Sequence, residues 1–446
     1  MPNLTPYGGV NEIGGNKILL EDRGTKLFLD FGISFSSLRK YFSGHLVPRA
    51  INGIGDYLEF DLLPGLRGLY SKTALKNSDL SYKGPEFHGI LLSHAHIDHS
   101  GYLPFIDERI PIFCSEATRL VLDAIREQGG LDLGRQKLVT FRERVRVGSL
   151  EIETFPVDHS IPGACGFIIK TSKGPIVYTG DIRMHGPKAQ ATRTFVRRAK
   201  ESRPTVMICE GTRISGDEEP LTEEVVKNAS REIVVHADQL VIAAFYSKDL
   251  DRFRTFHSIA KETRRKLVIS TKKAHYLTKL RRLPSLLVPN ISTDPNMLVY
   301  KRRRKSGRLA ASDYYPWERQ FIPRGVAYDF IKKHPAKVIL DLDLASFAEL
   351  IDIQPSCGEF IHSMSEPFSD EDIETNVMKN WLEHFNLNFH QLHASGHAQE
   401  RDLKEIVSQV RPKILLPIHT EHAHLFEDIA KGVDVRTLEL ASTIEL

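Results

Sequence analysis

Short runs of apolar residues recur along the chain, and each run is followed by a polar or turn-forming residue. Runs bounded in this way predict strands buried in a sheet. Helical spacing separates several of them, as where Leu120, Val121, Ala124 and Ile125 follow a candidate N-cap at Ser115. The runs lie at residues 17–20, 26–29, 89–92, 151–155, 176–178, 206–210, 240–245, 266–269, 337–340 and 414–418. This alternation predicts an α/β protein.

A second unit is predicted to begin near Pro204. The run 240–245 is almost continuously apolar, and runs 266–269 and 337–340 repeat the pattern with helical stretches between them. Continuous apolar runs are typical of parallel strands that are covered on both faces. We therefore expect a doubly wound α/β domain in this part of the chain.

The densest candidate chemistry is the string Ser-His-Ala-His-Ile-Asp-His at residues 93–99. His94 and His96 are two positions apart, so in an extended segment they point the same way. Asp98 and His99 then reach a neighbouring point, so that one short turn can serve two adjacent metal ions. These ligands suit Zn²⁺, or Mn²⁺ where oxygen ligands dominate. A solvated polar turn is the alternative, but such a string is rare by chance.

Further histidine and aspartate residues follow other apolar runs. Asp30, His159, Asp181 and His419 each come at or just after the end of such a run. Each alone is more often a cap or turn residue. Because α/β folds place ligands at the carboxyl ends of strands, the four together strengthen the prediction of a metal site.

The string at 93–99 resembles the His-x-His-x-Asp-His motif of the metallo-β-lactamase superfamily, and the later residues match its other motifs in order. The resemblance implies an αββα sandwich that holds two Zn²⁺ ions, with Mn²⁺ as the alternative. It assigns His94, His96 and His159 to one ion and Asp98, His99 and His419 to the other, with Asp181 between them. Asp30 is expected to be structural.

The predicted second unit lies between Asp181 and His419, so it is an insertion. The chain thereby resembles the β-CASP branch, and within it ribonuclease J in its short archaeal form. Glu210 in 209–213 and His397 in 393–398 carry this resemblance, together with the strings 179–183 and 363–368. We expect a metallo-β-lactamase domain in residues 1–204 and 398–446 and an inserted doubly wound α/β β-CASP domain in residues 205–397.

The resemblance implies hydrolysis of single-stranded RNA, 5′→3′ from 5′-monophosphate ends with release of 5′-mononucleotides, and internal cutting as an open alternative. His397 would protonate the leaving oxygen, and Glu210 would orient His397. Asp98 would shuttle the proton of the attacking water. The predicted phosphate and RNA contacts are Ser247, Ser395, Gly396, Ser363 and Ser365. A glycine loop at a helix N-terminus suits phosphate, whereas an ordinary cap is the alternative for Ser247 and for the loop. A lactonase- or thioesterase-like hydrolase and a non-catalytic nucleic-acid-binding subunit are the competing functions.

Charge is unevenly distributed although the net charge is only +3. Residues 261–308 contain fifteen Lys and Arg but only Glu262 and Asp294 as acidic residues. This asymmetry favours a polyanionic partner, with a solvated basic face as the alternative. Nearby aromatic residues either stack on bases or belong to the core; they are Tyr276, Tyr300, Tyr314, Tyr315 and Trp317.

Composition also bears on the cellular compartment of the protein. The four cysteines show no paired spacing, which is typical of buried thiols in a reducing compartment. We find neither a signal-peptide pattern nor an apolar run of membrane-spanning length. The sequence therefore predicts a cytoplasmic protein that does not bind a membrane, and it leaves a homodimer open.

Overall fold

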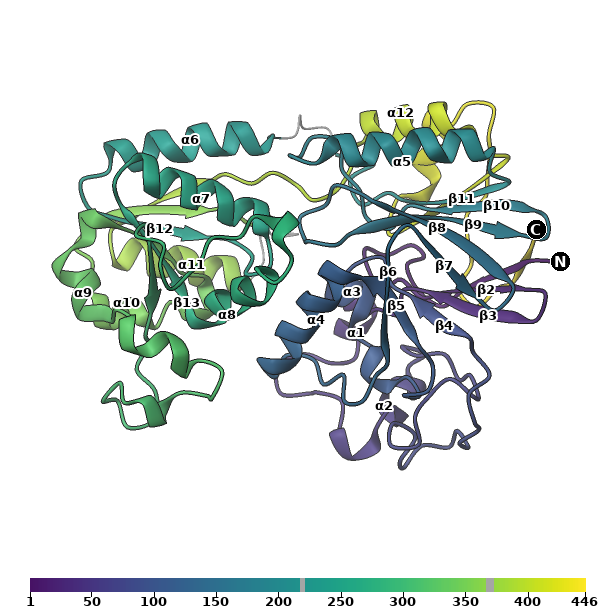
Figure 1. Cartoon of the computed structure of the whole chain (residues 1–446), viewed down its shortest axis with the longest axis horizontal. Helices are drawn as coiled ribbons and strands as arrows, with labels where there is room; N and C mark the ends of the chain where they lie inside the picture. Colours follow the sequence, from purple (N-terminus) through teal and green to yellow (C-terminus); the bar gives the residue numbers. More distant parts are fainter. Residues whose placement is uncertain (217–220, 366–372) are drawn as a thin grey trace. The chain divides into compact units, whose positions relative to one another are not determined.

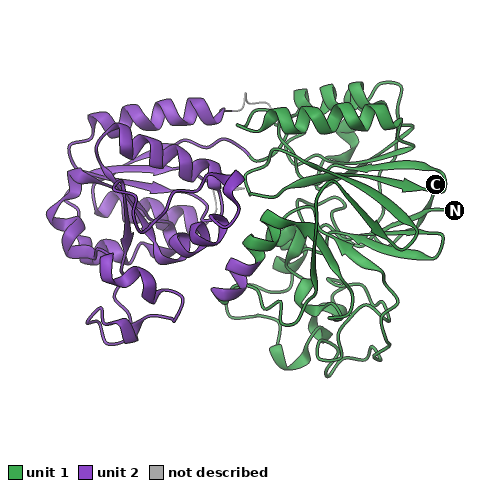
Figure 2. Ribbon diagram, in the orientation of Figure 1, with its two compact units in different colours: residues 1–122, 129–218, 396–446 green, residues 123–128, 219–395 purple. Residues whose placement is uncertain are grey.

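The computed structural model describes residues 1–216, 221–365 and 373–446. The chain divides into two compact units (Figures 1 and 2). Unit 1 comprises residues 1–122, 129–218 and 396–446, and unit 2 comprises residues 123–128 and 219–395. Most of unit 2 is therefore one continuous insertion into unit 1.

The first sheet of unit 1 has the strand order β20-β1-β2-β3-β4-β5-β6. Strands β3 to β6 are parallel, so the residues that follow β3 and β4 meet at one edge of the sheet. The strands are β1 (Asn3–Pro6), β2 (Ile18–Asp22), β3 (Thr25–Leu29), β4 (Gly89–Leu91), β5 (Ile112–Ser115), β6 (Leu138–Phe141) and β20 (Ile444–Glu445).

The second sheet of unit 1 has the order β19-β18-β11-β10-β9-β8-β7. Strands β10, β11 and β18 are parallel, and β8 runs in the same direction because β9 is antiparallel to both β8 and β10. The residues that follow β8, β10, β11 and β18 therefore share one edge. The strands are β7 (Arg144–Val147), β8 (Leu150–Pro156), β9 (Cys165–Thr171), β10 (Gly174–Tyr178), β11 (Val206–Glu210), β18 (Ile414–Ile418) and β19 (Asp434–Val435).

The two sheets of unit 1 pack face to face around a core that includes Leu29, Leu91, Phe167 and Ile208. Helices α5 and α12 cover the outer face of the second sheet, and α12 buries Leu403, Ile406, Val407 and Val410 there. Helices α1 to α4 lie beside the first sheet (Figure 1). This helix–sheet–sheet–helix order confirms the predicted αββα sandwich. The helices are α1 (Phe35–Arg39), α2 (Gly55–Glu59), α3 (Ile97–Ser100), α4 (Glu116–Glu127), α5 (Ala189–Ser202), α12 (Glu400–Val410) and α13 (Phe426–Ile429).

Strand β11 belongs to unit 1, where it pairs with β10 and β18. The boundary predicted at residue 205 assigned this strand to the inserted domain, so that assignment of β11 was wrong. An apolar run identifies a strand but not the sheet that it joins. The consequence is functional, because β11 places Glu210 beside the residues that follow β10 and β18.

Unit 2 contains a parallel six-stranded sheet in the order β14-β13-β15-β12-β16-β17. The chain builds outward from β12 in one direction and later in the other, which confirms the predicted doubly wound domain. The strands are β12 (Leu240–Ala244), β13 (Lys266–Ser270), β14 (Met297–Tyr300), β15 (Val338–Asp341), β16 (Gly358–His362) and β17 (Leu387–Gln391). The helices are α6 (Glu223–His236), α7 (Leu250–Glu262), α8 (Thr271–Leu280), α9 (Tyr328–Lys333), α10 (Glu349–Ile353) and α11 (Ile373–His384).

No helix in the described part of the chain combines the length and the apolar character that crossing a membrane requires.

Candidate metal centre

The turn after β4 has the geometry that its sequence predicts. His96 is extended (φ −67°, ψ 150°), and helix α3 begins at the next residue. His94 Nε2 and His96 Nδ1 therefore lie 3.1 Å apart, while the helix turns Asp98 and His99 to a neighbouring point. The segment after β3 holds this turn, since Phe31 N donates to the carbonyl of His99 at 2.8 Å.

One group of donor atoms comes from His94, His96, His159 and Asp181, all within 4.8 Å of one another. His159 Nε2 lies 3.0 Å from His96 Nδ1, and Asp181 Oδ2 lies 3.4 Å from His94 Nε2. The nitrogens of a tetrahedral zinc site, with Zn–N bonds of about 2.0–2.1 Å, are separated by roughly 3.3 Å. This spacing fits one ion.

A second group comes from Asp98, His99, Asp181 and His419, again within 4.8 Å. His419 Nε2 lies 3.1 Å from Asp98 Oδ2, and His99 Nε2 lies 3.2 Å from Asp181 Oδ2. Asp181 belongs to both groups. The structure thus brings together all seven side chains that the sequence suggested as ligands; their role as ligands stays a prediction.

The histidines are oriented by partners for their other ring nitrogens. His159 Nδ1 lies 2.6 Å from the carbonyl oxygen of Gly396, and His419 Nδ1 lies 2.8 Å from Thr212 Oγ1. His94 Nδ1 lies 3.0 Å from Ser93 Oγ. Partners of this kind fix the tautomer and the ring orientation that metal binding needs.

Asp30 positions His99, a member of the second group, by binding its other ring nitrogen. Its carboxylate is fully buried and accepts from His99 Nδ1 at 2.7 Å, Tyr178 Oη at 2.6 Å and Ser93 N at 2.6 Å. His99 Nε2 is thereby left facing Asp181. The contacts are those of the structural aspartate that the resemblance implies.

Electrostatics differs between the two groups: at His99 and His419 burial is outweighed by neighbouring carboxylates, Asp181 first, which raise the pKa of both imidazoles. Burial lowers the pKa of His94 and His159 well below 6.5, so both imidazoles are neutral, the form that binds metal. Burial opposes charge on Asp181, but the neighbouring histidines outweigh it and hold its pKa well below the usual range. Asp181 Oδ1 is buried and has no hydrogen-bond partner among the described residues. An ionised, partly unsatisfied carboxylate between two histidine groups fits a divalent metal ion.

Glu210 and His397 form the adjoining pair. Glu210 is fully buried at the end of β11; its Oε1 accepts from Ile182 N at 2.9 Å, and its Oε2 lies 3.1 Å from His397 Nδ1. Burial opposes protonation of His397, but Glu210 and then Asp181 outweigh it and raise its pKa to about 9. His397 therefore presents a protonated ring 4.0 Å from Asp181 Oδ2.

The sequence missed several residues that position this centre. Arg183 Nε pairs with Asp158 Oδ1 at 2.9 Å, both fully buried, directly beside His159. Thr212 and the Gly396 carbonyl hold two of the histidine rings. Asp158 directly precedes His159 in the sequence, whereas no sequence pattern marks a backbone carbonyl or a single threonine as a histidine partner.

The loop at Ser395 and Gly396 differs from its prediction. Helix α12 begins at Glu400 after an extended Gln399, so the loop does not form the helix N-terminus. Gly396 instead packs on a histidine, because a Cβ there would lie 3.0 Å from His159 Cε1. Phosphate binding by Ser395 and Gly396 stays a prediction.

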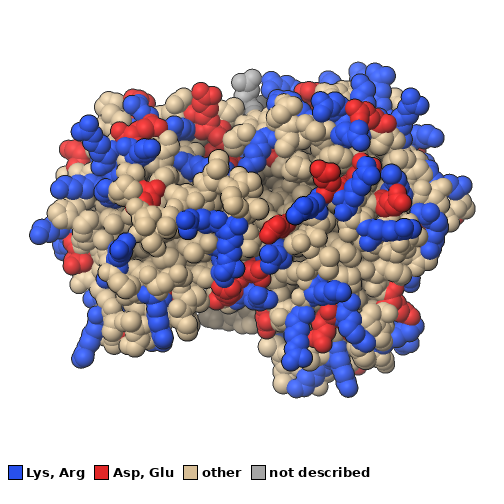
Figure 3. Space-filling view, viewed as in Figure 1, with Lys and Arg blue, Asp and Glu red and all other residues tan. Residues whose placement is uncertain are grey.

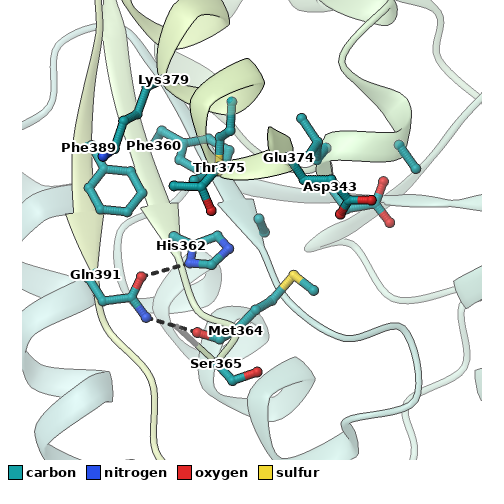
Figure 4. Close-up of a pocket in the computed structure, with 14 residues that line it drawn as sticks. Asp343, Phe360, His362, Met364, Ser365, Glu374, Thr375, Lys379, Phe389 and Gln391 are labelled. Atoms are coloured by element: carbon teal, nitrogen blue, oxygen red, sulfur yellow. Dashed lines mark hydrogen bonds between the residues drawn. The ribbon is translucent and has the colours of Figure 1, made fainter. Parts of the chain in front are cut away.

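The other predicted contacts, Ser247, Ser363 and Ser365, lie in unit 2 at the carboxyl ends of its strands. Ser247 is exposed in the turn after β12, and Asp249 caps α7 instead, so the alternative of a plain N-cap at Ser247 was wrong. Ser363 is buried against Arg252. Ser365 lines a cavity of 710 Å³, where His362 bonds Gln391 at 2.7 Å (Figure 4).

Comparison with known proteins agrees with this geometry. Residues 59–239 match the beta-lactamase superfamily domain, and residues 384–436 match the Zn-dependent metallo-hydrolase RNA specificity domain. The chain is 22% identical over 467 residues to ribonuclease J of Helicobacter pylori J99, covering 98% of this chain and 59% of that protein. It is 24% identical over 438 residues to ribonuclease J of Mycolicibacterium smegmatis, covering 95% and 69%.

A crystal structure of a protein of unknown function from Enterococcus faecalis V583 superposes with a TM-score of 0.79 at 22% identity, covering the whole of both chains. The chain spans 56–59% of the length of the first curated relatives that it matches.

The fold and the histidine–aspartate cluster define a protein of the metallo-β-lactamase superfamily. Within that superfamily the chain is a ribonuclease J-like protein of the β-CASP type, as the sequence motifs predicted.

Proposed function

We propose that this chain is a metal-dependent ribonuclease that cleaves phosphodiester bonds of single-stranded RNA, using two Zn²⁺ ions or, as the alternative, Mn²⁺. The observation that carries the proposal is the shared Asp181 between two histidine groups, with His397 and Glu210 beside it. The match to an RNA specificity domain and the similarity to ribonucleases J support RNA as the substrate.

The seven side chains from His94 to His419 would hold the ions. Bound divalent ions would lower the pKa of a coordinated water and offset the charge of the phosphate. Side chains of the protein accept and donate the protons. The Asp98 side chain is 19% exposed and receives the proton of the attacking water.

His397, held by Glu210, donates its proton to the departing ribose 3′ oxygen. The oxygen of water forms the new bond to phosphorus as the P–O3′ bond breaks. The products carry a 5′ phosphate and a 3′ hydroxyl.

We further propose a 5′→3′ exonuclease that prefers a 5′-monophosphate end. Ser247, exposed in the turn after β12, would hold the terminal phosphate, and the loop at Ser395 and Gly396 would contact a phosphate of the chain. Ser365 would contact the RNA backbone, whereas Ser363 is fully buried and does not reach it. The homodimer and the cytoplasmic location stay predictions.

The test is digestion of labelled RNA with a 5′-monophosphate, 5′-triphosphate or 5′-hydroxyl end, with Zn²⁺ or Mn²⁺ and with chelator. Release of mononucleotides from the monophosphate substrate, lost with chelator and slowed in Ser247→Ala, is the expected result. Internal fragments irrespective of the 5′ end would replace the exonuclease by an endonuclease. Intact RNA after incubation with metal-loaded protein would overturn the ribonuclease proposal and direct attention to small esters.

A further inference from the structure

The connection from β14 to α9 forms a distinct feature of unit 2. Its residues 301–324, here the basic lobe, contain only short 3₁₀ turns at Ala311–Asp313 and Arg319–Arg324. A segment of this length without regular structure inside a compact domain is usually functional. The basic lobe contains eight Lys and Arg against two acidic residues.

Both acidic residues of the basic lobe are buried and bind within unit 2. Asp313 Oδ2 accepts from Ser306 Oγ at 2.7 Å and from Ala310 N at 3.0 Å. Glu318 is fully buried and accepts from Thr271 Oγ1 at 2.6 Å and from Tyr315 N at 3.1 Å. The two carboxylates fix the shape of the basic lobe, and they add almost no negative charge to its surface.

The basic residues divide into anchors and exposed cations. Arg302 and Arg303 pair with Glu349 and Asp352 of α10. Lys305, Arg308 and Arg319 are exposed and form no ion pair with any described residue. In Figure 3 the basic lobe, at the lower left as in Figure 1, shows Lys and Arg side chains and no acidic ones. This surface is complementary to a polyanion.

The basic lobe also exposes flat aromatic surface. The Tyr315 side chain is 56% exposed, and its ring is within 9° of parallel to that of Trp317, with centroids 6.3 Å apart. Trp317 rests on the buried His275 ring at 5.1 Å, and the Arg304 guanidinium lies 5.5 Å from the Tyr315 centroid. The Tyr315–Trp317 pair is thus held in place before any ligand binds.

The neighbouring aromatics lack this exposure. Tyr276, Tyr300 and Tyr314 are buried, so the core alternative holds for them. Of the five aromatics considered from the sequence, Tyr315 and Trp317 are therefore the two that are accessible in the basic lobe.

We propose that the basic lobe is a separate binding surface for single-stranded RNA, in which bases stack on the Tyr315–Trp317 pair and phosphates pair with Lys305, Arg308 and Arg319. This inference rests on the proposed ribonuclease function. A single strand is the occupant that matches both features, because its bases are free to stack while its backbone supplies the charge. A duplex presents the same charge with its bases covered.

The test is fluorescence anisotropy of the full-length, metal-loaded protein with a phosphorothioate-protected single-stranded RNA. Because each ring supplies a stacking surface for a base, the double variant Tyr315→Ala/Trp317→Ala should bind on the order of tenfold more weakly. Tyr315→Phe should keep the wild-type affinity. The double variant Tyr41→Ala/Phe60→Ala is the matched control, because these rings also form an exposed stacked pair, with centroids 4.1 Å apart, but lie in unit 1.

The contribution of the exposed cations to RNA binding is measured from the dependence of RNA affinity on salt concentration. Replacing Lys305, Arg308 and Arg319 by Ala removes three phosphate contacts, which should reduce the slope of log affinity against log salt by about 2. The double aromatic variant should keep the wild-type slope. Wild-type affinity in the folded double aromatic variant, or an equal loss in Tyr41→Ala/Phe60→Ala, would overturn the proposal.

Hydrolysis of bis(p-nitrophenyl) phosphate separates this inference from the proposed function. The small diester reports the metal centre, so the basic-lobe variants should hydrolyse it at the wild-type rate. Wild-type protein that binds RNA through the Tyr315–Trp317 pair yet cleaves neither substrate would refute the catalytic proposal and leave the binding surface standing. If the double aromatic variant loses affinity equally for single-stranded RNA and for a duplex of the same length, base stacking on the Tyr315–Trp317 pair is refuted.

Discussion

Asp30→Asn is the sharpest perturbation of the metal centre, because it changes one atom of a side chain that belongs to neither group of candidate ligands. Asp30 Oδ2 accepts from His99 Nδ1 at 2.7 Å and from Tyr178 Oη at 2.6 Å, while Oδ1 accepts from Ser93 N at 2.6 Å. An amide nitrogen in the Oδ2 position would place one N–H donor against another, the N–H of His99. In the opposite orientation the amide nitrogen would face the N–H of Ser93 in the same way.

The imidazole of His99 can accept from that amide only if its proton moves to Nε2, the nitrogen that lies 3.2 Å from Asp181 Oδ2. A protonated Nε2 cannot bind metal. Loss of such a partner typically lowers metal affinity by about 10- to 100-fold. Replacing a buried, charge-assisted hydrogen bond should also destabilise the fold by about 1.5–3 kcal/mol.

The assay is competition with a chromophoric chelator, combined with thermal unfolding with and without added metal. Tyr178→Phe is the control, since it removes one donor but leaves the carboxylate on His99; its metal affinity should stay within about threefold of wild type. Asp30→Asn protein that is folded and holds metal as tightly as wild type would refute the tautomer argument.

Three further predictions follow from single contacts. His397→Ala should retain its metal but cleave RNA about 10²–10⁴-fold more slowly, with little loss on bis(p-nitrophenyl) phosphate, whose leaving group needs no proton; equal losses on both would exclude the acid role. Gly32→Ala should destabilise the fold by more than about 3 kcal/mol in denaturant titration, because its Cβ would lie 1.7 Å from the Asp98 carbonyl oxygen. Gly65→Ala, with nothing within 4 Å, should be near neutral. Burial lowers the pKa of Lys17 to about 8. The unfolded chain therefore binds more protons above pH 8, and wild-type stability relative to Lys17→Met should rise by about 2 kcal/mol between pH 7 and 9.5; a flat difference would refute it.

That the seven candidate ligands lie close together was predictable, because their positions depend on strand ends. Parallel strands bring their carboxyl ends to one edge, so Asp181 and His419 meet although 237 residues separate them in the sequence. The histidine string at 93–99 needs only an extended residue followed by a helical turn. Both conditions are local or topological, and a hydrophobic pattern reports them.

The supporting contacts were not predictable in the same way. Gly396 acts on His159 through a carbonyl oxygen, which every residue has, and Thr212 acts on His419 through a hydroxyl with no distinctive neighbours. The assignment of β11 to the wrong domain has a related cause. Its five buried residues suit any central parallel strand, and only pairing with β10 and β18 decides the sheet.

The basic segment shows why a count of charges along a sequence is a weak guide to binding. Lys273 is buried on Asp341, and Arg302 and Arg303 pair with acidic residues far outside the segment, so much of the excess is neutralised by the fold. The surface of the basic lobe, by contrast, carries more positive charge than its amino-acid composition suggests, because Asp313 and Glu318 are buried. A polyanion responds to the charge that remains at the surface. The RNA contact that we propose is therefore the small area around Tyr315, rather than the whole stretch from 261 to 308.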